Sequence, residues 1–341
     1  MAVNSINGTA GSDYLTGLLK QINEIHGLDD GDTILGGRLP DVLTGDAGDD
    51  FVWGDAGNDI IDGGAGYDVL FGSKGDDQIG GGSDNDFISG GKGNDVINAD
   101  QGNDVVDGNS GDDVINGGDD ADYLFGSSGN DTIDGGAGDD YASGGSGDDV
   151  LVASSGGDTY LGGSGFDTLA FNGVNGHVSV DVSKHTALVA NDGADDQASL
   201  TGIEKIVAGD AGINALGSKH DEIFVGGAGD DWFRGKGGAD VFTGGKGMDT
   251  FAWLKKDVID GKAADIVTDF EVGVDHLELS DFVKGGQAWE KAVRLADTAD
   301  GVMVQGNAKG VWTDVAVLQG LHVDAVGADQ HHMTLADLGM F

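Results

Sequence analysis

The stretch Gly90-Gly91-Lys92-Gly93-Asn94-Asp95-Val96-Ile97-Asn98 contains the pattern that decides the fold of this 341-residue chain. Nine-residue units of this kind follow one another without insertion or deletion from Gly27 to Ala170, which makes sixteen units. Position six is aspartate in all sixteen, and position eight is Leu, Ile or Val in fourteen of them. A fixed period of this length indicates a repeat architecture in which successive units stack on one another.

Each unit combines a turn with a short strand. The glycine-rich first half must turn sharply, and glycine reaches positive φ without a steric cost. The second half is an extended segment whose position-eight side chain points inward while its two neighbours point outward.

Composition excludes several classes of protein. The chain has 66 glycines, no cysteine and 61 acidic against 17 basic residues, for a net charge of −44. Such a charge repels nucleic acid, and the missing cysteines exclude disulfides and thiolate metal sites. We expect no transmembrane segment and no amino-terminal export signal. A glycine-rich acidic linker has a similar composition, but the strict period argues against it.

The unit follows the pattern G-G-x-G-x-D-x-U-x, where U is a large aliphatic residue, and on these residues the chain resembles the RTX (repeats-in-toxin) family of calcium-binding repeat proteins. Four further units run from Gly217 to Ala252, with Glu222 in place of the first aspartate. A weaker copy with Asp13 and Leu15 stands alone at residues 8–16. The resemblance implies an all-β fold, a right-handed parallel β-roll with two sheets back to back, in which two units make one coil and the sixteen units make about eight coils.

The aspartates of stacked units predict a series of calcium sites. Carboxylates that repeat at the strand spacing of about 4.8 Å repel one another and need cations between them. Oxygen ligands without His or Cys suit Ca²⁺, which accepts six to eight flexible ligands, better than Mg²⁺. We expect roughly sixteen Ca²⁺ ions and a repeat region that is disordered without them.

The predicted metal ligands are Asp32, Asp41, Asp50, Asp59, Asp68, Asp77, Asp86, Asp95, Asp104, Asp113, Asp122, Asp131, Asp140, Asp149, Asp158, Asp167, Asp231, Asp240 and Asp249. Some units depart from the pattern, and we expect weaker or empty sites there: Leu39 and Pro40 at positions four and five, Ala99 and Ala153 at position one, and Asp84 and Asp120 at position four.

We expect five segments along the chain. Residues 1–26 form an amino-terminal cap with the isolated repeat and a short amphipathic helix over 13–25, which the helical spacing of Leu15, Leu18, Leu19, Ile22 and Ile25 favours. A partner-binding helix is the alternative. Residues 27–170 form the β-roll, 171–216 an irregular β interruption with a strand at 178–182, and 217–252 a second repeat block.

Residues 253–341 form a β-rich carboxy-terminal cap. The expected elements are strands at 266–270 and 276–281, a helix over 287–295, and a hairpin over 302–318 that turns at Gly306-Asn307. This segment resembles the carboxy-terminal target domain of type I secretion substrates. The chain also ends in acidic and apolar residues, Asp337 to Phe341, as those signals do.

The two outer faces of the expected roll differ. Positions seven and nine of one row hold Phe51, Trp53, Phe71, Phe87, Tyr123, Phe125 and Tyr141, while the same positions of the other row hold no aromatic residue. Exposed aromatic rings on a flat sheet can stack on sugar rings or mediate self-association. In the alternative, another segment of the chain folds over this face.

We expect no enzyme, because HExxH, G-x-S-x-G and cysteine are all missing. The expected function is a secreted structural or adhesive protein, or the repeat region of a large adhesin. It would leave a Gram-negative bacterium unfolded through the type I secretion apparatus and fold on extracellular calcium at the cell surface or in a biofilm. The alternative is a carbohydrate-binding module, similar to the repeat modules of alginate epimerases, which binds cell-surface or extracellular polysaccharide through the aromatic face.

Overall fold

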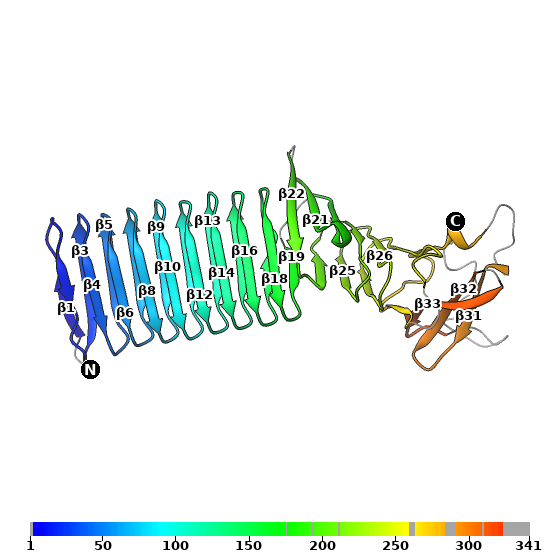
Figure 1. Ribbon diagram of the computed structural model, residues 1–341, viewed down its shortest axis with the longest axis horizontal. Coiled ribbons are helices and arrows are strands. Elements are labelled where there is room, and N and C mark those ends of the chain that lie inside the picture. The colour runs from blue at the N-terminus through cyan, green and yellow to red at the C-terminus, as the bar shows by residue number, and fades with distance from the viewer. Residues whose placement is uncertain are drawn as a thin grey trace. The chain divides into compact units, whose positions relative to one another are not determined.

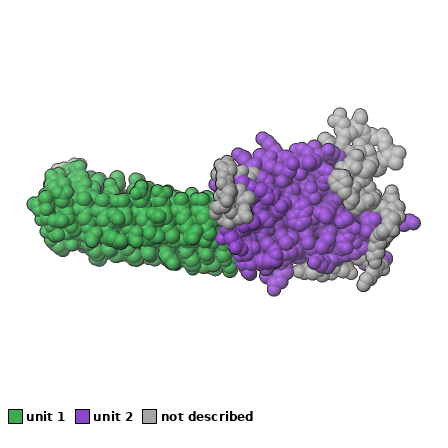
Figure 2. Space-filling view, turned by 90° about the horizontal axis from the view of Figure 1, so that it is seen from above, with its two compact units in different colours: residues 1–169, 198–203 green, residues 170–197, 204–341 purple. Residues whose placement is uncertain are grey.

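The computed structural model describes residues 3–172, 174, 176–191, 194–210, 212–258, 263–283, 291–308 and 310–322. The chain divides into two compact units (Figure 2). Unit 1 comprises residues 1–169 and 198–203, and unit 2 comprises residues 170–197 and 204–341. In the described part, no helix has the length and hydropathy needed to span a membrane.

Unit 1 is a parallel β-roll whose consecutive strands alternate between two sheets (Figure 1). The odd sheet contains β1 (Val3–Asn7), β3 (Ile22–Asp29), β5 (Val42–Ala47), β7 (Ile60–Ala65), β9 (Gln78–Ser83), β11 (Val96–Gln101), β13 (Val114–Asp119), β15 (Thr132–Ala137) and β17 (Val150–Val152). The even sheet contains β2 (Tyr14–Thr16), β4 (Thr33–Gly37), β6 (Phe51–Asp55), β8 (Val69–Lys74), β10 (Phe87–Lys92), β12 (Val105–Ser110), β14 (Tyr123–Ser128), β16 (Tyr141–Ser146) and β18 (Thr159–Ser164).

The repeat length sets the strand register. Ile88 of β10 lies beside Leu70 of β8 and Val106 of β12, each 18 residues away. These position-eight side chains are fully buried between the two sheets, as the pattern predicts. Tyr160 and Ala142, which replace the aliphatic residue, are buried as well. The all-β parallel roll is therefore confirmed, and the core of unit 1 contains about one side chain per repeat.

The amino-terminal helix expected over residues 13–25 is wrong. Residues 14–16 form β2 and residues 22–29 form β3, and both strands join the roll. Leu15 and Ile25 occupy the places that correspond to position eight of a repeat unit. Their separation of ten residues fits both the roll and one face of a helix, so it did not distinguish between them. Leu18 and Leu19, which would complete the apolar face of a helix, are 50% and 57% exposed.

Unit 2 contains two parallel series of strands. One runs through β23 (Lys205–Ala208), β25 (Ile223–Gly227), β27 (Val241–Gly245), β29 (Asp265–Val267) and β33 (Val311–Gln319). The other runs through β20 (Val178–Asp181), β24 (Ile213–Leu216), β26 (Trp232–Arg234), β28 (Thr250–Ala252) and β30 (His276–Glu278). In the second repeat block phenylalanine replaces the aliphatic core, and the ring pairs Phe224–Phe242, Phe233–Phe242 and Phe233–Phe251 lie 5.6–5.9 Å apart.

The remaining strands add antiparallel pairs. β21 (Thr186–Asn191) pairs with β20, and β31 (Val293–Asp297), β32 (Gly301–Ala308) and β33 form a meander. The expected strand at 178–182 and the final hairpin are confirmed. The strands expected at 266–270 and 276–281 are shorter than predicted, because they end at Val267 and Glu278 and residues 280–282 form a 3-10 helix. The hairpin turns between Ala308 and Val311 rather than at Gly306-Asn307, because both of those residues pair with β33.

The helix expected over 287–295 is wrong at its end, where β31 begins at Val293. Residues 284–290 lie outside the described part of the chain, as do the acidic and apolar residues Asp337 to Phe341. The expected handedness of the roll and the five segment boundaries stay predictions.

Candidate metal-binding rows

Within each repeat block, the position-six aspartates lie in two rows, one along each line of turns. All nineteen predicted ligands are buried. In fourteen successive steps from Asp32 to Asp149, the backbone N–H of one aspartate donates to Oδ1 of the aspartate 18 residues later, at 2.6–3.0 Å. The carboxylates are therefore fixed at strand spacing by the backbone itself.

The second carboxylate oxygen of these aspartates has no such donor. Oδ2 of each aspartate from Asp32 to Asp149, and of Asp231 and Asp240, is buried and accepts no hydrogen bond within the described structure. A buried carboxylate oxygen without a donor or cation is unfavourable. Because the same orphan atom repeats from turn to turn, it marks a series of sites rather than an isolated defect.

The first glycine of each unit leaves space beside this oxygen. A Cβ added to Gly81 would lie 2.6 Å from Asp86 Oδ2 and 2.6 Å from the carbonyl oxygen of Ala99 in the next turn. Most other position-one glycines face the same pair of oxygens, one from the carboxylate of their own unit and one from a carbonyl 18 residues later. Glycine at position one thus lets a carboxylate and a carbonyl converge.

Burial makes the negative charge of these rows unfavourable when no cation is present. It raises the pKa of Asp59, Asp68 and Asp86 from the ordinary 3.8 to about 7. The backbone N–H bonds lower these pKa values, but neighbouring carboxylates such as Asp50 beside Asp68 raise them again. The rows therefore attract either protons or cations.

The donor set suits a calcium ion. The convergent atoms are carboxylate and carbonyl oxygens, which are hard ligands that Ca²⁺ accepts in flexible number and geometry. Within the described residues, no three Asp, Glu, His or Cys side chains gather as a metal site. Each turn supplies one carboxylate, so any ion here needs backbone carbonyls from adjacent turns as well.

Units that depart from the repeat pattern behave in three ways. Asp84 and Asp120 adopt positive φ of 76° and 73°, whereas the position-four glycines of other units with positive φ reach 118–150°, so these turns keep the sign of φ but not its value. At Ala99 and Ala153 a buried methyl group occupies the space that glycine leaves open in other units. Leu39 does not adopt positive φ, so the turn before Asp41 differs from the others.

The rows extend further than the repeat pattern indicated. Asn23 takes an aspartate place before Asp41, and its N–H donates to Asp41 Oδ1 at 2.6 Å. Asp265 and Asp275 accept the N–H groups of Asp240 and Asp249 at 2.9 and 3.1 Å, so they continue the rows in unit 2. Their spacings of 25 and 26 residues from those partners hid them from a search at period nine.

The two faces of the roll in unit 1 differ, as the sequence predicts. On the even sheet, Phe71 lies 5.7 to 6.2 Å from the rings of Phe51, Trp53 and Phe87. Trp53, Phe87 and Tyr123 are 45%, 42% and 57% exposed, so the described residues do not cover them. The second aromatic group joins Tyr141 to Tyr123 and Phe125.

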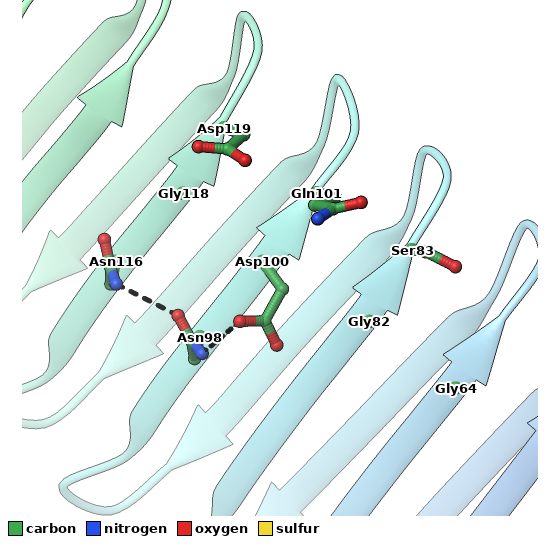
Figure 3. A pocket seen from close by; sticks show the side chains of 9 residues that line it. All are labelled: Gly64, Gly82, Ser83, Asn98, Asp100, Gln101, Asn116, Gly118 and Asp119. Carbon is green, nitrogen blue, oxygen red and sulfur yellow. Dashed lines mark hydrogen bonds between the residues drawn. The ribbon is translucent and has the colours of Figure 1, made fainter.

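The odd sheet has a polar groove in place of these rings (Figure 3). Asn116 Nδ2 donates to Asn98 Oδ1 at 3.0 Å, and Asn98 Nδ2 donates to Asp100 Oδ1 at 2.6 Å. This face therefore presents hydrogen-bonded amide and carboxylate groups where the even sheet presents aromatic rings.

Comparison with protein families places the repeats in a known group. The model of the RTX calcium-binding nonapeptide repeat matches overlapping segments that together cover residues 26–169, and it matches residues 216–251. These segments make up just over half of the chain and contain all nineteen predicted ligands. No curated protein matches the sequence.

The neighbouring glycines Gly80 and Gly81 test the space beside the carboxylates. We expect Gly81→Ala to raise the calcium concentration needed for folding and to cost about 1–3 kcal/mol in the loaded state, because its methyl group would crowd Asp86 Oδ2. Gly80→Ala is the matched control, since its nearest neighbour lies 3.9 Å away. Equal calcium midpoints for the two variants in a circular dichroism titration would contradict this role.

The raised pKa values give the metal-free chain an unusual pH dependence. Folded aspartates with pKa of about 7, against 3.8 when exposed, bind more protons than the unfolded chain, so the stability of the metal-free roll increases as pH falls from 7 towards 4. We expect protein freed of metal by gel filtration to gain β-structure between pH 8 and 5 in far-UV circular dichroism. Calcium-loaded protein shows the opposite trend, because protons compete with the ion. A metal-free spectrum that does not change with pH argues against buried stacked carboxylates.

Proposed function

The chain belongs to the family of RTX calcium-binding nonapeptide-repeat proteins, and from this premise we propose a secreted protein whose repeats fold only when calcium fills the aspartate rows. Repeats of this family are typical of secreted bacterial proteins. The observation that carries the proposal is the row of buried Oδ2 atoms without donors. Bound calcium supplies the positive charge that such oxygens need.

The proposed route follows from calcium affinity. Extracellular calcium modules bind the ion at about 10⁻⁴ to 10⁻³ M. At cytosolic calcium levels the rows therefore stay empty, and the repeats stay unfolded and suited to passage through the type I secretion apparatus of a Gram-negative bacterium. Folding outside the cell then opposes return of the chain. The carboxy-terminal residues 253–341 are the proposed target domain for this export.

We further propose a structural or adhesive role rather than catalysis. Loaded rows make unit 1 a rigid rod-like roll, since each turn is tied to the next by backbone and carboxylate hydrogen bonds. Such a module spaces or presents a surface at the cell exterior. The sequence offers none of the catalytic motifs considered above.

Calcium titration tests the folding proposal directly. We expect a cooperative gain of β-structure in far-UV circular dichroism as calcium rises from chelator to about 10 mM, which spans the extracellular affinity range. Magnesium at the same concentrations produces little change, because it gives up its water ligands reluctantly. Full β-structure in chelator would show that packing alone holds the fold and would end the proposal.

A second candidate function is binding of an acidic polysaccharide on the even sheet. A groove of about 520 Å³ beside the aromatic rings is lined by Trp53, Lys74, Lys92 and Asn109, among others. Lys74 and Lys92 stand side by side in register, and neither forms an ion pair with an acid in the described structure. Two adjacent cations without partners in so acidic a chain favour an anionic ligand, and Trp53 offers a ring face for stacking on a sugar.

Affinity electrophoresis in gels containing alginate or neutral dextran tests this candidate. We expect the calcium-loaded protein to be retarded by alginate, Trp53→Ala with Phe71→Ala to weaken binding about tenfold, and Lys74→Gln with Lys92→Gln to remove the preference for alginate. Tyr67→Ala, an exposed aromatic residue in a turn, is the control and leaves binding unchanged. Wild-type mobility in both gels would exclude this function.

A further inference from the structure

The ends of the aspartate rows differ from their interior. Interior carboxylates have an Oδ2 atom without a donor, as described above. At six positions at the ends of these rows, a protein N–H, O–H or NH₂ group takes the position that a cation would otherwise fill, whereas Asp231, the first aspartate of its row in unit 2, keeps an Oδ2 without a donor. This difference bears on which turns bind calcium, so the inference drawn from it rests on the proposed function.

Asn23 illustrates the substitution at the start of one row. Its Nδ2 donates to Asp41 Oδ1 at 2.9 Å and to the carbonyl oxygens of Gln21 and Leu18 at 3.2 and 3.4 Å. A carboxylate and two carbonyls are the kinds of ligand that a calcium ion gathers. Asn23 Oδ1 is satisfied too, by the N–H of Leu18 at 2.8 Å. This turn has no charge left to neutralise.

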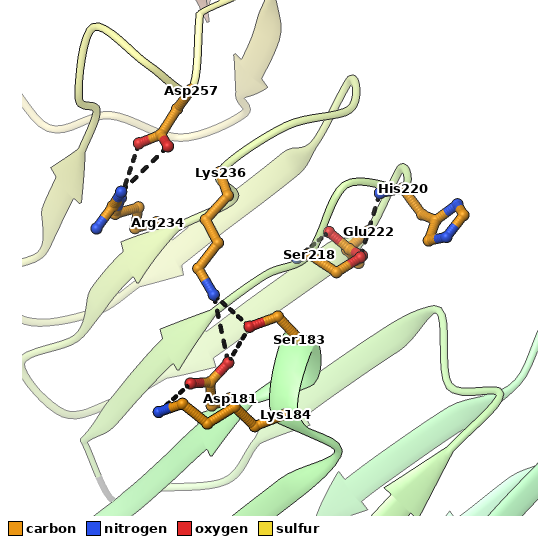
Figure 4. A network of polar contacts seen from close by, with 9 residues as sticks. All are labelled: Asp181, Ser183, Lys184, Ser218, His220, Glu222, Arg234, Lys236 and Asp257. Carbon is orange, nitrogen blue, oxygen red and sulfur yellow. Dashed lines mark hydrogen bonds and ion pairs between the residues drawn. The ribbon is translucent and has the colours of Figure 1, made fainter.

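A hydroxyl residue at position two closes two other turns. Asp13, at the start of the second row, accepts the N–H and the hydroxyl of Thr9 on Oδ2 at 2.6 and 2.9 Å. Glu222, at the start of the second repeat block, accepts the N–H of Ser218 at 3.1 Å and also its hydroxyl (Figure 4). The acid in each turn is bonded within its own unit.

The last turns use aromatic residues and the backbone. Tyr160 donates its hydroxyl to Asp158 Oδ2 at 2.6 Å, in the same unit whose first glycine is replaced by Ala153. In unit 2, Trp253 Nε1 donates to Asp265 Oδ2 at 2.6 Å. The N–H of Glu271 donates to Asp275 Oδ2 at 2.7 Å.

The backbone φ at position two distinguishes the closures at Thr9, Ser154 and Ser218 from turns whose carboxylate keeps an Oδ2 without a donor. Ser73 and Ser127 also stand at position two, but they adopt φ of 80° and 77°, and the carboxylates of their units keep an orphan Oδ2. Thr9, Ser154 and Ser218 do not adopt positive φ. The N–H of Thr9 and of Ser218 donates to the acid, and the N–H of Ser154 donates to the hydroxyl of Tyr160 at 3.1 Å.

We propose that these protein donors close the aspartate rows, so that the turns of Asp13, Asn23, Asp158, Glu222, Asp265 and Asp275 hold no calcium and the ions bind only between them. The physical reason is that a row end lacks one adjacent turn. An ion there would find only part of the six to eight ligands it takes. The closures divide the calcium sites into two separate arrays, one in each repeat block, and limit the number of ions.

One single and one double substitution, at two different closures, test the proposal in the full-length protein. Asn23→Asp replaces the donating amide by a carboxylate of the same shape. Ser218→Gly with Glu222→Asp restores positions two and six of the repeat pattern in that turn, with His220 still at position four. We expect each variant to bind one more calcium ion than wild type when ions per chain are counted by native mass spectrometry. Ser73→Gly is the matched control and leaves the count unchanged.

Circular dichroism in calcium shows whether each variant is folded. If Asn23→Asp does not fold, the Ser218→Gly, Glu222→Asp variant decides alone. If the variants fold but bind the wild-type number of calcium ions, the proposal that these donors close the rows is overturned. A higher number of bound calcium ions in Ser73→Gly overturns it as well. Wild-type protein that binds no calcium overturns the proposed function instead, so the two failures are distinguishable.

Discussion

Two rows of buried carboxylates, stacked at the spacing of β-strands, are the constraint on which the rest of this structure depends. At about 4.8 Å and an effective dielectric constant of about 20, neighbouring charges repel by on the order of 3 kcal/mol. Burial of one aliphatic side chain per repeat stabilises by about 1.5–3 kcal/mol. The core therefore does not outweigh the charge, and the fold requires that the rows be neutralised.

The turn residues follow from the same requirement. One carboxylate oxygen is held by the backbone N–H of the previous coil, which fixes the aspartate but leaves the other oxygen to find a cation. Glycine at position one leaves room for carbonyl and carboxylate oxygens to converge, as at Gly81. Residues on the outer faces of the two sheets take no part in neutralising the rows, so their identity can vary. On the even sheet they include aromatic rings beside Lys74 and Lys92.

Much of unit 1 could be predicted because every signal shares one period. The strands, their register and the burial of the aspartates all follow from nine residues per unit and 18 per coil. Errors arose where that period slips. A one-residue insertion near Gly17 gave the apolar residues between Leu15 and Ile25 a helical spacing, although both residues lie in strands. Asp265 and Asp275 were missed because longer loops precede them.

The sequence by itself determined the family, the parallel roll and the residue type of each row, because these depend on composition at fixed positions. Only the tertiary structure decided which turns leave a carboxylate oxygen without a donor. Ser73 and Ser218 are the same residue at the same position of a unit, yet only Ser218 turns its N–H towards the acid. The sign of φ at that position differs between the two units. It is set by the fold around each turn, and the identity of the residue at that position does not encode it.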